Sequence, residues 1–386
     1  MLFPFDQRGV LDLCAELDAW ATRIDERILP RRWEGRLRRA LEAEAVAAST
    51  HMEGVPVTVA DTLKILANDP PEAVSERDRA LVRGYRDAMR YVQRRADDGN
   101  LTWNRELTVG VQDRVLAGDR GAGAGALRRR AAWVSSTGGE VVFQPPDHEQ
   151  VPSLVDAACT TIEAAAWHPA VAAAWLHVAV AAIHPFRDGN GRTARALASL
   201  TMYRGGFRHP AFTSLEEWWG RHPAAYYGAF ACLGDTFRDD ADVTPFITAH
   251  VRAQVAQVRE LAVRQQRDGL LWIALENLLD ELGLPPRLAN ALYDSVFGRD
   301  VTTGYYRDLA DTSAATARND LAAACAARLL TPEGRTRGRR YLPGPRLLVL
   351  LAEQIGAPEA SERAIAETLA KRATAAATPP PPSAQV

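Results

Sequence analysis

Apolar residues recur along this chain mostly three or four positions apart, with polar residues between them, which is the spacing of amphipathic helices. One stretch, 170–183, is rich in Ala, Val, Leu and Trp and carries no charge, so it predicts a buried helix. Further helices are predicted near residues 8–25, 33–53, 73–95, 101–116, 151–166 and 190–204, and another helix ends near 267. The expected fold class is therefore mainly all-α.

The pattern changes after residue 267. An apolar helix is predicted over 270–282, and a short helix over 302–310 precedes a second helix over 314–329, which the polar residues 311–313 cap. The basic run 334–341 then predicts a hairpin that ends at Pro343. This order resembles a winged helix-turn-helix. The side chains expected to face a DNA groove or its phosphates are Ser313, Thr316, Arg318, Asn319, Arg337, Arg339 and Arg340.

These changes predict four regions. An N-terminal helical region spans 1–97, a central core spans 98–267, and the winged-helix-like region spans 268–346. A C-terminal helix and a tail complete the chain over 347–386. The tail from Thr374 onward holds four consecutive prolines and small residues, so it is expected to be disordered.

Composition narrows the function classes. The 386 residues are 47% hydrophobic and 24% charged with a net charge of −2, so no global field attracts nucleic acid or an anionic membrane. No run of eighteen apolar residues predicts a membrane span, and no secretory leader is evident at the start. The four cysteines lie far apart, which is typical of a reducing compartment. We therefore expect a cytoplasmic protein, and the sequence leaves its oligomeric state open, a homo-oligomer included.

The segment that follows the buried helix gathers groups suited to phosphate chemistry. Pro185 ends the helix, because the residue before a proline is pushed away from helical geometry, and His184 then lies at that end. Gly189 and Gly191 permit a tight turn before the next helix, whose first N–H groups favour an anion. Two guanidinium groups follow three residues apart on one face.

This segment resembles the signature of the Fic family, H-x-F-x-[DE]-G-N-G-R-x-x-R. Every fixed position is met, by His184, Phe186, Asp188, Gly189, Asn190, Gly191, Arg192 and Arg195. The resemblance implies a Fic-type helical bundle and a protein adenylyltransferase, which uses ATP and Mg²⁺ to move AMP to a Ser, Thr or Tyr hydroxyl of a target protein.

The resemblance also implies a role for each residue. His184 is expected to be the base, Phe186 to anchor the loop in the core, and Asp188 to hold Mg²⁺. Residues 189–191 would form an anion hole, with Arg192 and Arg195 on the β- and γ-phosphates. Related Doc-type kinases tend to carry Lys where Gly191 stands, so the glycine favours adenylyl transfer.

A second match stands upstream. Ser49 to Gly54 resembles the family's inhibitory motif, [ST]-x-x-x-E-[GN], at the end of the helix predicted over 33–53. Ser49 and Glu53 are four residues apart and so share a helical face. By this resemblance Glu53 would pair with Arg195 and keep that arginine from the γ-phosphate.

Two further features belong to the same resemblance. The run from Gly138 to Pro146 reads as a short hairpin and resembles the Fic flap, in which Val141, Val142 and Phe143 would dock the target as an added strand. Aromatic residues at helical spacing follow near 218–230, and Tyr226 or Tyr227 is expected to touch the adenine. In contrast, the glycine-rich run 121–126 lacks a preceding strand, which predicts an ordinary flexible loop rather than a dinucleotide site.

The sequence leaves three readings open. The first is the autoinhibited adenylyltransferase. The second is a DNA-binding regulator whose Fic core senses a nucleotide, although the intact His184 argues against a mere sensor. The third keeps the fold and removes AMP from a modified target. The C-terminal region suits DNA binding and protein docking equally well.

Overall fold

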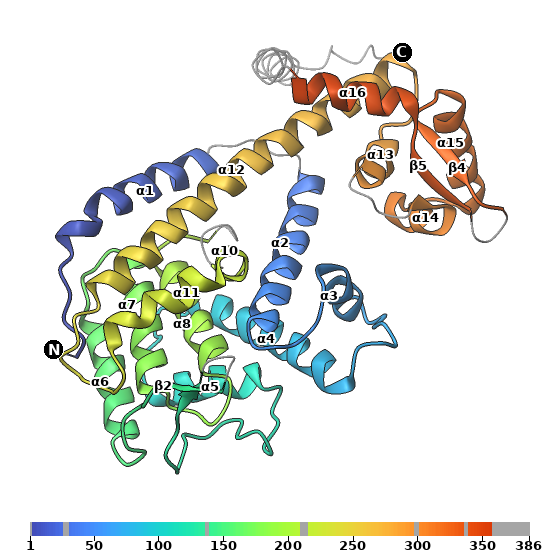
Figure 1. The fold of residues 1–386 in the computed structure, drawn as a ribbon. Coiled ribbons are helices and arrows are strands. Elements are labelled where there is room, and N and C mark those ends of the chain that lie inside the picture. Colours follow the sequence, from blue (N-terminus) through green and yellow to red (C-terminus); the bar gives the residue numbers. More distant parts are fainter. Residues whose placement is uncertain are drawn as a thin grey trace, which may run out of the picture. The chain divides into compact units, whose positions relative to one another are not determined.

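The computed structural model of the protein describes residues 2–25, 31–135, 139–208, 215–296, 301–335 and 339–356. The chain forms two compact units, Met1–Ala262 and Val263–Val386. Unit 1 is built almost entirely of helices, as the sequence predicts (Figure 1). Within the described residues, no helix is long and apolar enough to cross a membrane. The mainly α-helical fold class is confirmed.

The first helices of unit 1 lead up to the signature segment. They are η1 (Arg8–Val10), α1 (Leu11–Asp25), α2 (Arg31–His51), α3 (Val59–Leu66), α4 (Glu76–Ala96) and α5 (Arg105–Val115). Helix α3 was not predicted, yet the Thr58 and Asp61 side chains form a capping box at its start. Helix α2 ends at His51, so Glu53 lies in the turn that follows and not on the helix.

Three helices form the core of unit 1 around the signature segment. These are α6 (Val151–Ala164), α7 (Pro169–Ile183) and α8 (Asn190–Arg204). Helix α7 is buried on nearly all sides, as its uncharged sequence predicts, and it packs against α6 and α8. Helices α4 and α5 pack against α8. The segment between α7 and α8 is therefore anchored by two buried helices.

A small hairpin lies in the same unit. Strands β1 (Val134–Ser135) and β2 (Val141–Phe143) pair antiparallel, so a hairpin is present, but its first strand precedes the predicted run 138–146. Gly138 lies outside the described residues. Val141 and Val142 are exposed, whereas Phe143 is buried. The hairpin thus keeps one anchor in the core and presents two apolar side chains to solvent.

The last elements of unit 1 are helical. They are α10 (Glu216–Arg221), α11 (Pro223–Ala229), η2 (Phe230–Leu233) and the long α12 (Thr244–Glu281), whose final part belongs to unit 2. Helix α1 runs alongside the first part of α12, where Arg259 pairs with Glu16 (Figure 1). The predicted break between helices at 267 and 270 is wrong. An interior glycine such as Gly269 costs a helix only about 1 kcal/mol, too little to end it.

Unit 2 combines helices with a three-stranded antiparallel sheet of order β3-β5-β4. Its elements are α13 (Leu288–Val296), β3 (Val301–Thr302), α14 (Thr303–Ala310), α15 (Ala314–Ala326), β4 (Leu330–Glu333), β5 (Arg340–Pro343) and α16 (Pro345–Gly356). The short helix, second helix and hairpin lie close to the predicted positions, whereas α13 and β3 were missed. Arg337 and the proline-rich tail lie outside the described residues.

Buried apolar side chains from most of these elements form the core of unit 2, and a polar cluster fixes one side of it. Arg287 donates to both carboxylate oxygens of Asp320 at 2.6 and 2.9 Å, and the Tyr306 hydroxyl donates to the same carboxylate at 2.8 Å. Bidentate pairing of this kind fixes α15 against the segment before α13.

Candidate active site

The signature segment leaves α7 through a strained residue. His184 has a φ of 48°, the left-handed region that a residue other than glycine rarely occupies. Its backbone N–H donates to the Val180 carbonyl at 3.0 Å and so closes the helix end. The side chain of Phe186 is fully buried and anchors the segment in the core, in the place the sequence predicted.

Asn190 locks this loop from within. Its side-chain oxygen accepts from the Phe186 N–H at 2.9 Å, and its side-chain amide donates to the Phe186 carbonyl at 2.9 Å. The side chain of Asn190 is therefore engaged with the backbone, and what it can offer an anion is its own backbone N–H. Gln112, which was not predicted to belong to the site, donates from its Nε2 to the Asp188 carbonyl at 3.1 Å.

Helix α8 begins without a side-chain cap. Its N-cap, Gly189, has a φ of 80°, and a Cβ there would lie 3.3 Å from Val115 and from Leu116. The first N–H groups of a helix have no intrahelical partner, so they and the helix dipole favour an anion at this end. The predicted anion site at residues 189–191 thus lies at a helix start that no side chain caps.

Arg192 lies beside this helix end with unused donors. Its side chain is only 3% exposed, and one terminal nitrogen donates to Asp188 Oδ1 at 3.3 Å. Its Nε and Nη1 atoms are buried, and no residue in the described part of the chain accepts a hydrogen bond from them. A buried guanidinium with unsatisfied donors costs free energy unless an anion completes it.

Arg195, one turn further along α8, is equally buried but fully engaged. Its Nη2 donates to Glu53 Oε1 at 2.9 Å and to the Ser49 carbonyl at 3.1 Å, and its Nε donates to Ser49 Oγ at 3.0 Å. The Glu53 side chain is 24% exposed. The structure thus brings together Ser49, Glu53 and Arg195, which the sequence analysis expected to meet.

Gly191 makes room for Glu53. A Cβ added at Gly191 would overlap Glu53 Oε1 and would lie 3.1 Å from Arg195 Nη1. The same carboxylate has its other oxygen 4.0 Å from Arg192 Nε. Glu53 therefore lies over the glycine turn between the two arginines. Gly54, with a φ of 82°, completes the turn that carries Glu53 away from α2.

A buried carboxylate, that of Glu216, also acts on Arg195. The hydroxyl of the fully buried Tyr85 donates to Glu216, and the charge of Glu216 acts on Arg195. Burial and the neighbouring Glu216 both raise the pKa of Tyr85 well above its ordinary value. Tyr85 and Glu216 were missed in the sequence, because they are 131 residues apart and carry no local signal.

Burial and nearby charges shift the pKa of His184. Burial lowers its pKa below 6.5, and the positive charge of Arg128 acts in the same direction. A hydrogen bond with the Ala181 backbone and the negative charge of Glu53 act in the opposite direction. The net effect is a lowered pKa, so the imidazole is neutral at pH 7 and can accept a proton.

Asp188 offers a carboxylate at the mouth of the turn. Its side chain is partly exposed, and its Oδ1 accepts from the Gly189 N–H at 2.5 Å. Among the described residues, no three His, Cys, Asp or Glu side chains cluster to hold a metal ion. Mg²⁺ is commonly bound through one or two carboxylates together with substrate phosphates, so a single carboxylate here fits it.

The two tyrosines expected near the adenine lie in different surroundings. Tyr226 is buried, and its hydroxyl lies 3.1 Å from His177 Nε2 and accepts from Arg195 Nη1 at 3.5 Å. Tyr227 is 57% exposed, with its ring against that of Tyr226. Tyr226 therefore belongs to the network around Arg195, and Tyr227 is the one free to meet a planar ligand.

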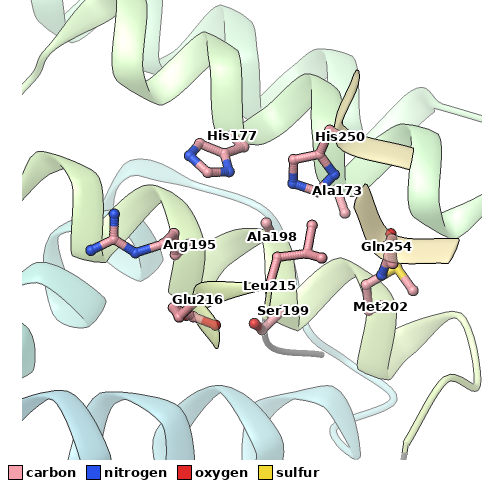
Figure 2. Close-up of a pocket in the computed structure, with 10 residues that line it drawn as sticks. All are labelled: Ala173, His177, Arg195, Ala198, Ser199, Met202, Leu215, Glu216, His250 and Gln254. Atoms are coloured by element: carbon pink, nitrogen blue, oxygen red, sulfur yellow. The ribbon is translucent and has the colours of Figure 1, made fainter. Parts of the chain in front are cut away.

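A small cavity beside Arg195 is lined by both polar and apolar side chains. Figure 2 shows Arg195 and Ser199 from α8, His177 from α7, and His250 and Gln254 from α12 around it. It offers about 20 Å³ to the centre of a water molecule, which is room for about one water. Burial lowers the pKa of His250 to about 3 and holds that of His177 well below its ordinary value. Both rings are therefore neutral parts of the core.

Comparisons with known proteins match the region that holds the signature segment. Residues 101–202 match the model of the Fic/DOC family. Two curated relatives are the proteins named protein adenylyltransferase Fic from Aedes aegypti and Nematostella vectensis. Each is 28% identical over 162 residues, which is 41% of this chain and 32% or 37% of the relative. The matching region thus spans about a third of the length of these relatives.

Solved structures show the same fold. A Fic family protein from Desulfovibrio desulfuricans G20 aligns with a TM-score of 0.60 at 20% identity, covering 89% of this chain and 98% of that one. Fic-1 from C. elegans aligns with a TM-score of 0.55 at 19% identity, covering 66% and 72%. Residues 101–202 are thus similar to the Fic/DOC family, and the chain shares the fold of these structures.

Proposed function

We propose that the protein is an autoinhibited protein adenylyltransferase, which moves AMP from ATP to a Ser, Thr or Tyr hydroxyl of a target protein. The observation that carries the proposal is the turn from His184 to Arg192. It combines a neutral base with a helix N-terminus and a buried guanidinium that has two donors without a hydrogen-bond acceptor in the described residues. The names of the curated relatives support the same activity.

In the proposed reaction, the hydroxyl oxygen of the target attacks the α-phosphorus of ATP. A bond forms between that oxygen and phosphorus, the bond to the bridging oxygen of the β-phosphate breaks, and pyrophosphate leaves. His184 accepts the hydroxyl proton, which its lowered pKa permits at neutral pH. Such transfer depends mainly on positioning and charge stabilisation.

The phosphates would lie at the start of α8. The N–H groups after Gly189 and the unsatisfied donors of Arg192 suit the β-phosphate. Arg195 can meet the γ-phosphate only when Glu53 releases it, which is the basis of the proposed autoinhibition. Asp188 would hold Mg²⁺, which supplies positive charge to the bridging phosphate oxygens.

The remaining contacts serve the two substrates. Exposed Tyr227 is placed to stack on the adenine. The exposed Val141 and Val142 of β2 would receive an extended target segment as an added strand. We place this activity in the cytoplasm, because the cysteines are free thiols, a state that a reducing compartment maintains.

The test is transfer of label from ATP. Purified wild type and Glu53→Gly are incubated with ATP carrying ³²P at the α-phosphate, and label on protein is measured over time. We expect Glu53→Gly to label itself or another protein faster, and Glu53→Gly with His184→Ala to be inactive. ATP labelled at the γ-phosphate is the matched control, because adenylyl transfer leaves that label in pyrophosphate.

Two results would redirect the proposal. Label from the γ-phosphate on protein would indicate a kinase. Loss of AMP from an adenylylated protein on incubation with wild type, without transfer by Glu53→Gly, would indicate removal of AMP on the same fold. Absence of both reactions would contradict an enzyme of this class.

We also propose that unit 2 binds duplex DNA, which stays a separate candidate function. Arg318 and Asn319 are exposed on α15, and Arg339 is exposed beside the hairpin. Ser313 instead caps α15, where its hydroxyl accepts from the Thr316 N–H at 3.1 Å and lies 2.9 Å from the Thr316 hydroxyl. Replacing Arg318 and Arg339 with Gln should weaken duplex binding and lower its salt dependence by about 0.9 for each phosphate that the variant no longer neutralises. Failure of the intact protein to bind a duplex at low salt would favour protein docking.

A further inference from the structure

Arg128 lies in the loop between α5 and β1, and its side chain is buried, unlike those of the two arginines that follow it. Arg129 and Arg130 are exposed, whereas Arg128 is 7% exposed. Arginine is almost never fully buried without a partner, because its charge loses hydration. The contacts of Arg128 therefore indicate why it is buried.

The guanidinium of Arg128 donates to backbone carbonyls. Its Nε donates to the His184 carbonyl at 2.8 Å, and its Nη2 donates to the Pro146 carbonyl at 2.5 Å and reaches that of Ile183 at 3.5 Å. Its backbone N–H also donates to the Pro185 carbonyl at 2.9 Å. One residue therefore joins the end of α7, the start of the signature segment and the chain just after β2.

The chemistry of these acceptors is unusual for an arginine. In the described part of the chain, no carboxylate forms an ion pair with Arg128, although the charge of Asp147 acts on it from a distance. Burial lowers the pKa of Arg128. Its charge is balanced by backbone carbonyl dipoles. Two of these carbonyls lie at the negative end of α7, where helix carbonyls lack intrahelical partners, and the other two belong to Pro146 and to Arg130, which accepts from Nη1 at 3.0 Å. A planar fork with several donors suits this task better than an ammonium group.

The same contact explains how His184 keeps its strained backbone. A left-handed φ of 48° costs a residue other than glycine free energy and persists only where the surroundings fix it. Arg128 holds the His184 carbonyl on one side of that residue, and the Val180 carbonyl holds its N–H on the other.

We propose that Arg128 is a positioning residue that fixes the backbone of His184 and ties the flap to it. This inference rests on the proposed adenylyl transfer for its effect on rate. Because the flap and the His184 backbone are then fixed relative to each other, a target hydroxyl docked on the flap stays at a constant position relative to the base. Effective positioning matters, because a displacement of about 1 Å can cost about 10²-fold in rate.

The test compares Arg128→Gln and Arg128→Lys with Arg129→Gln, all in the Glu53→Gly protein. Arg129 is the matched control, being the same residue type, one position away and exposed. The first readout is amide hydrogen exchange in peptides covering 141–147 and 183–189. We expect exchange in both peptides to rise about tenfold in Arg128→Gln, since hydrogen bonds from a charged donor are removed, and to stay unchanged in Arg129→Gln.

The second readout is label transfer against pH, together with ATP affinity. Arg128→Gln should transfer about 10²-fold more slowly while ATP affinity changes less than about threefold, because the phosphate groups are held from α8. The pH of half-maximal transfer should rise, since the described charges that act on His184 are Arg128, which lowers its pKa, and Glu53, which is absent in this background. Arg128→Lys should recover part of the rate.

Three outcomes overturn the inference. Unchanged exchange in both peptides would show that Arg128 does not tie them. A uniform rise in exchange with weakened ATP binding in both Arg128 variants would show that it only supports the fold. If the rate falls while the pH of half-maximal transfer stays unchanged, Arg128 does not act on the rate through His184. If Glu53→Gly itself transfers no label, the proposed function fails, and the exchange of the two peptides alone decides the role of Arg128.

Discussion

Arg192 and Arg195 lie three residues apart on α8, and each side chain is 3% exposed, yet their surroundings differ. Arg195 donates to Ser49 and Glu53, and the buried Tyr85 and Glu216 stand behind it. Arg192 keeps two buried donors without a partner in the described residues. One side of the helix start is complete without a ligand, whereas the other side becomes complete only when an anion binds.

We infer from this difference that the Arg192 side serves to bind phosphate, whereas the Arg195 side serves to regulate that binding. The Arg192 side is ready for phosphate, because its donors gain the free energy of hydrogen bonds that the protein does not supply. On the Arg195 side a phosphate must replace a carboxylate that is already bound. A phosphate ligand can contact both arginines only if it binds Arg195 more strongly than Glu53 does.

The largest expected effect comes from His184, which belongs to neither the Arg192 side nor the Arg195 side. His184→Ala in the Glu53→Gly protein should lower transfer by about 10²–10⁴-fold, the usual contribution of a general base. ATP affinity should stay within about threefold, because the phosphate contacts are expected from α8 and, in the described residues, neither arginine bonds to His184. Single-turnover transfer and equilibrium binding of ATP measure the two effects. A parallel loss of affinity would mean that His184 shapes the phosphate site itself.

The arginines can be compared directly by replacing each with Met, which keeps much of the apolar stem. Arg195→Met should lower the free energy of unfolding by about 3 kcal/mol, because it leaves carboxylates without their partner. Arg192→Met should change it by less than about 1 kcal/mol, since it removes two donors that are already unsatisfied and one long contact with the partly exposed Asp188. Urea denaturation without nucleotide gives both values. Equal losses would show that Arg192 is satisfied in solution.

The Arg195 side should also respond to pH through the cavity behind it. His250 has a pKa of about 3 in the folded protein and 6.5 as its ordinary value, so the unfolded chain binds the extra proton first. Its contribution is fully present above pH 6.5 and is lost as the pH falls toward 3. At pH 5 the loss amounts to about 2 kcal/mol.

Urea denaturation at pH 7 and pH 5 checks this, with His250→Gln against wild type. The variant should lose less stability between the two pH values, because one buried imidazole is gone. His222→Gln, which alters a less buried histidine, is the control and should behave like wild type. An identical pH response in His250→Gln would mean that its ring is already protonated or hydrated in the fold.

The smallest expected effect comes from a single methyl group. Gly191→Ala places a Cβ where Glu53 Oε1 lies, so it should loosen Glu53 from Arg195 without removing either charge. We expect a severalfold rise in label transfer, below that of Glu53→Gly, from a perturbation of about 1 kcal/mol. Adding Gly191→Ala to Glu53→Gly should give no further rise. A further rise would place the effect of residue 191 on the nucleotide instead.

Local sequence determined much of this protein. The uncharged run 170–183 fixes a buried helix, Pro185 and the glycines fix its end and the next start, and the hairpin around β2 follows from its glycines and β-branched residues. Helix α3 was missed although Thr58 and Asp61 signal it, and the break predicted between 267 and 270 does not occur in α12. These features depend on residues a few positions apart, which a pattern can record.

What only the tertiary structure decided are the pairings between distant residues. The predicted Glu53–Arg195 contact joins positions 142 apart, and it came from a family resemblance and not from spacing. Nothing in the run 128–130 marks the first arginine as the buried one, and the glycine loop 121–125 is held by Gln112 and packs against Arg187. Such partners are chosen by how α2, α4, α8 and their loops pack, because burial forces each polar group to find a partner wherever the fold places one.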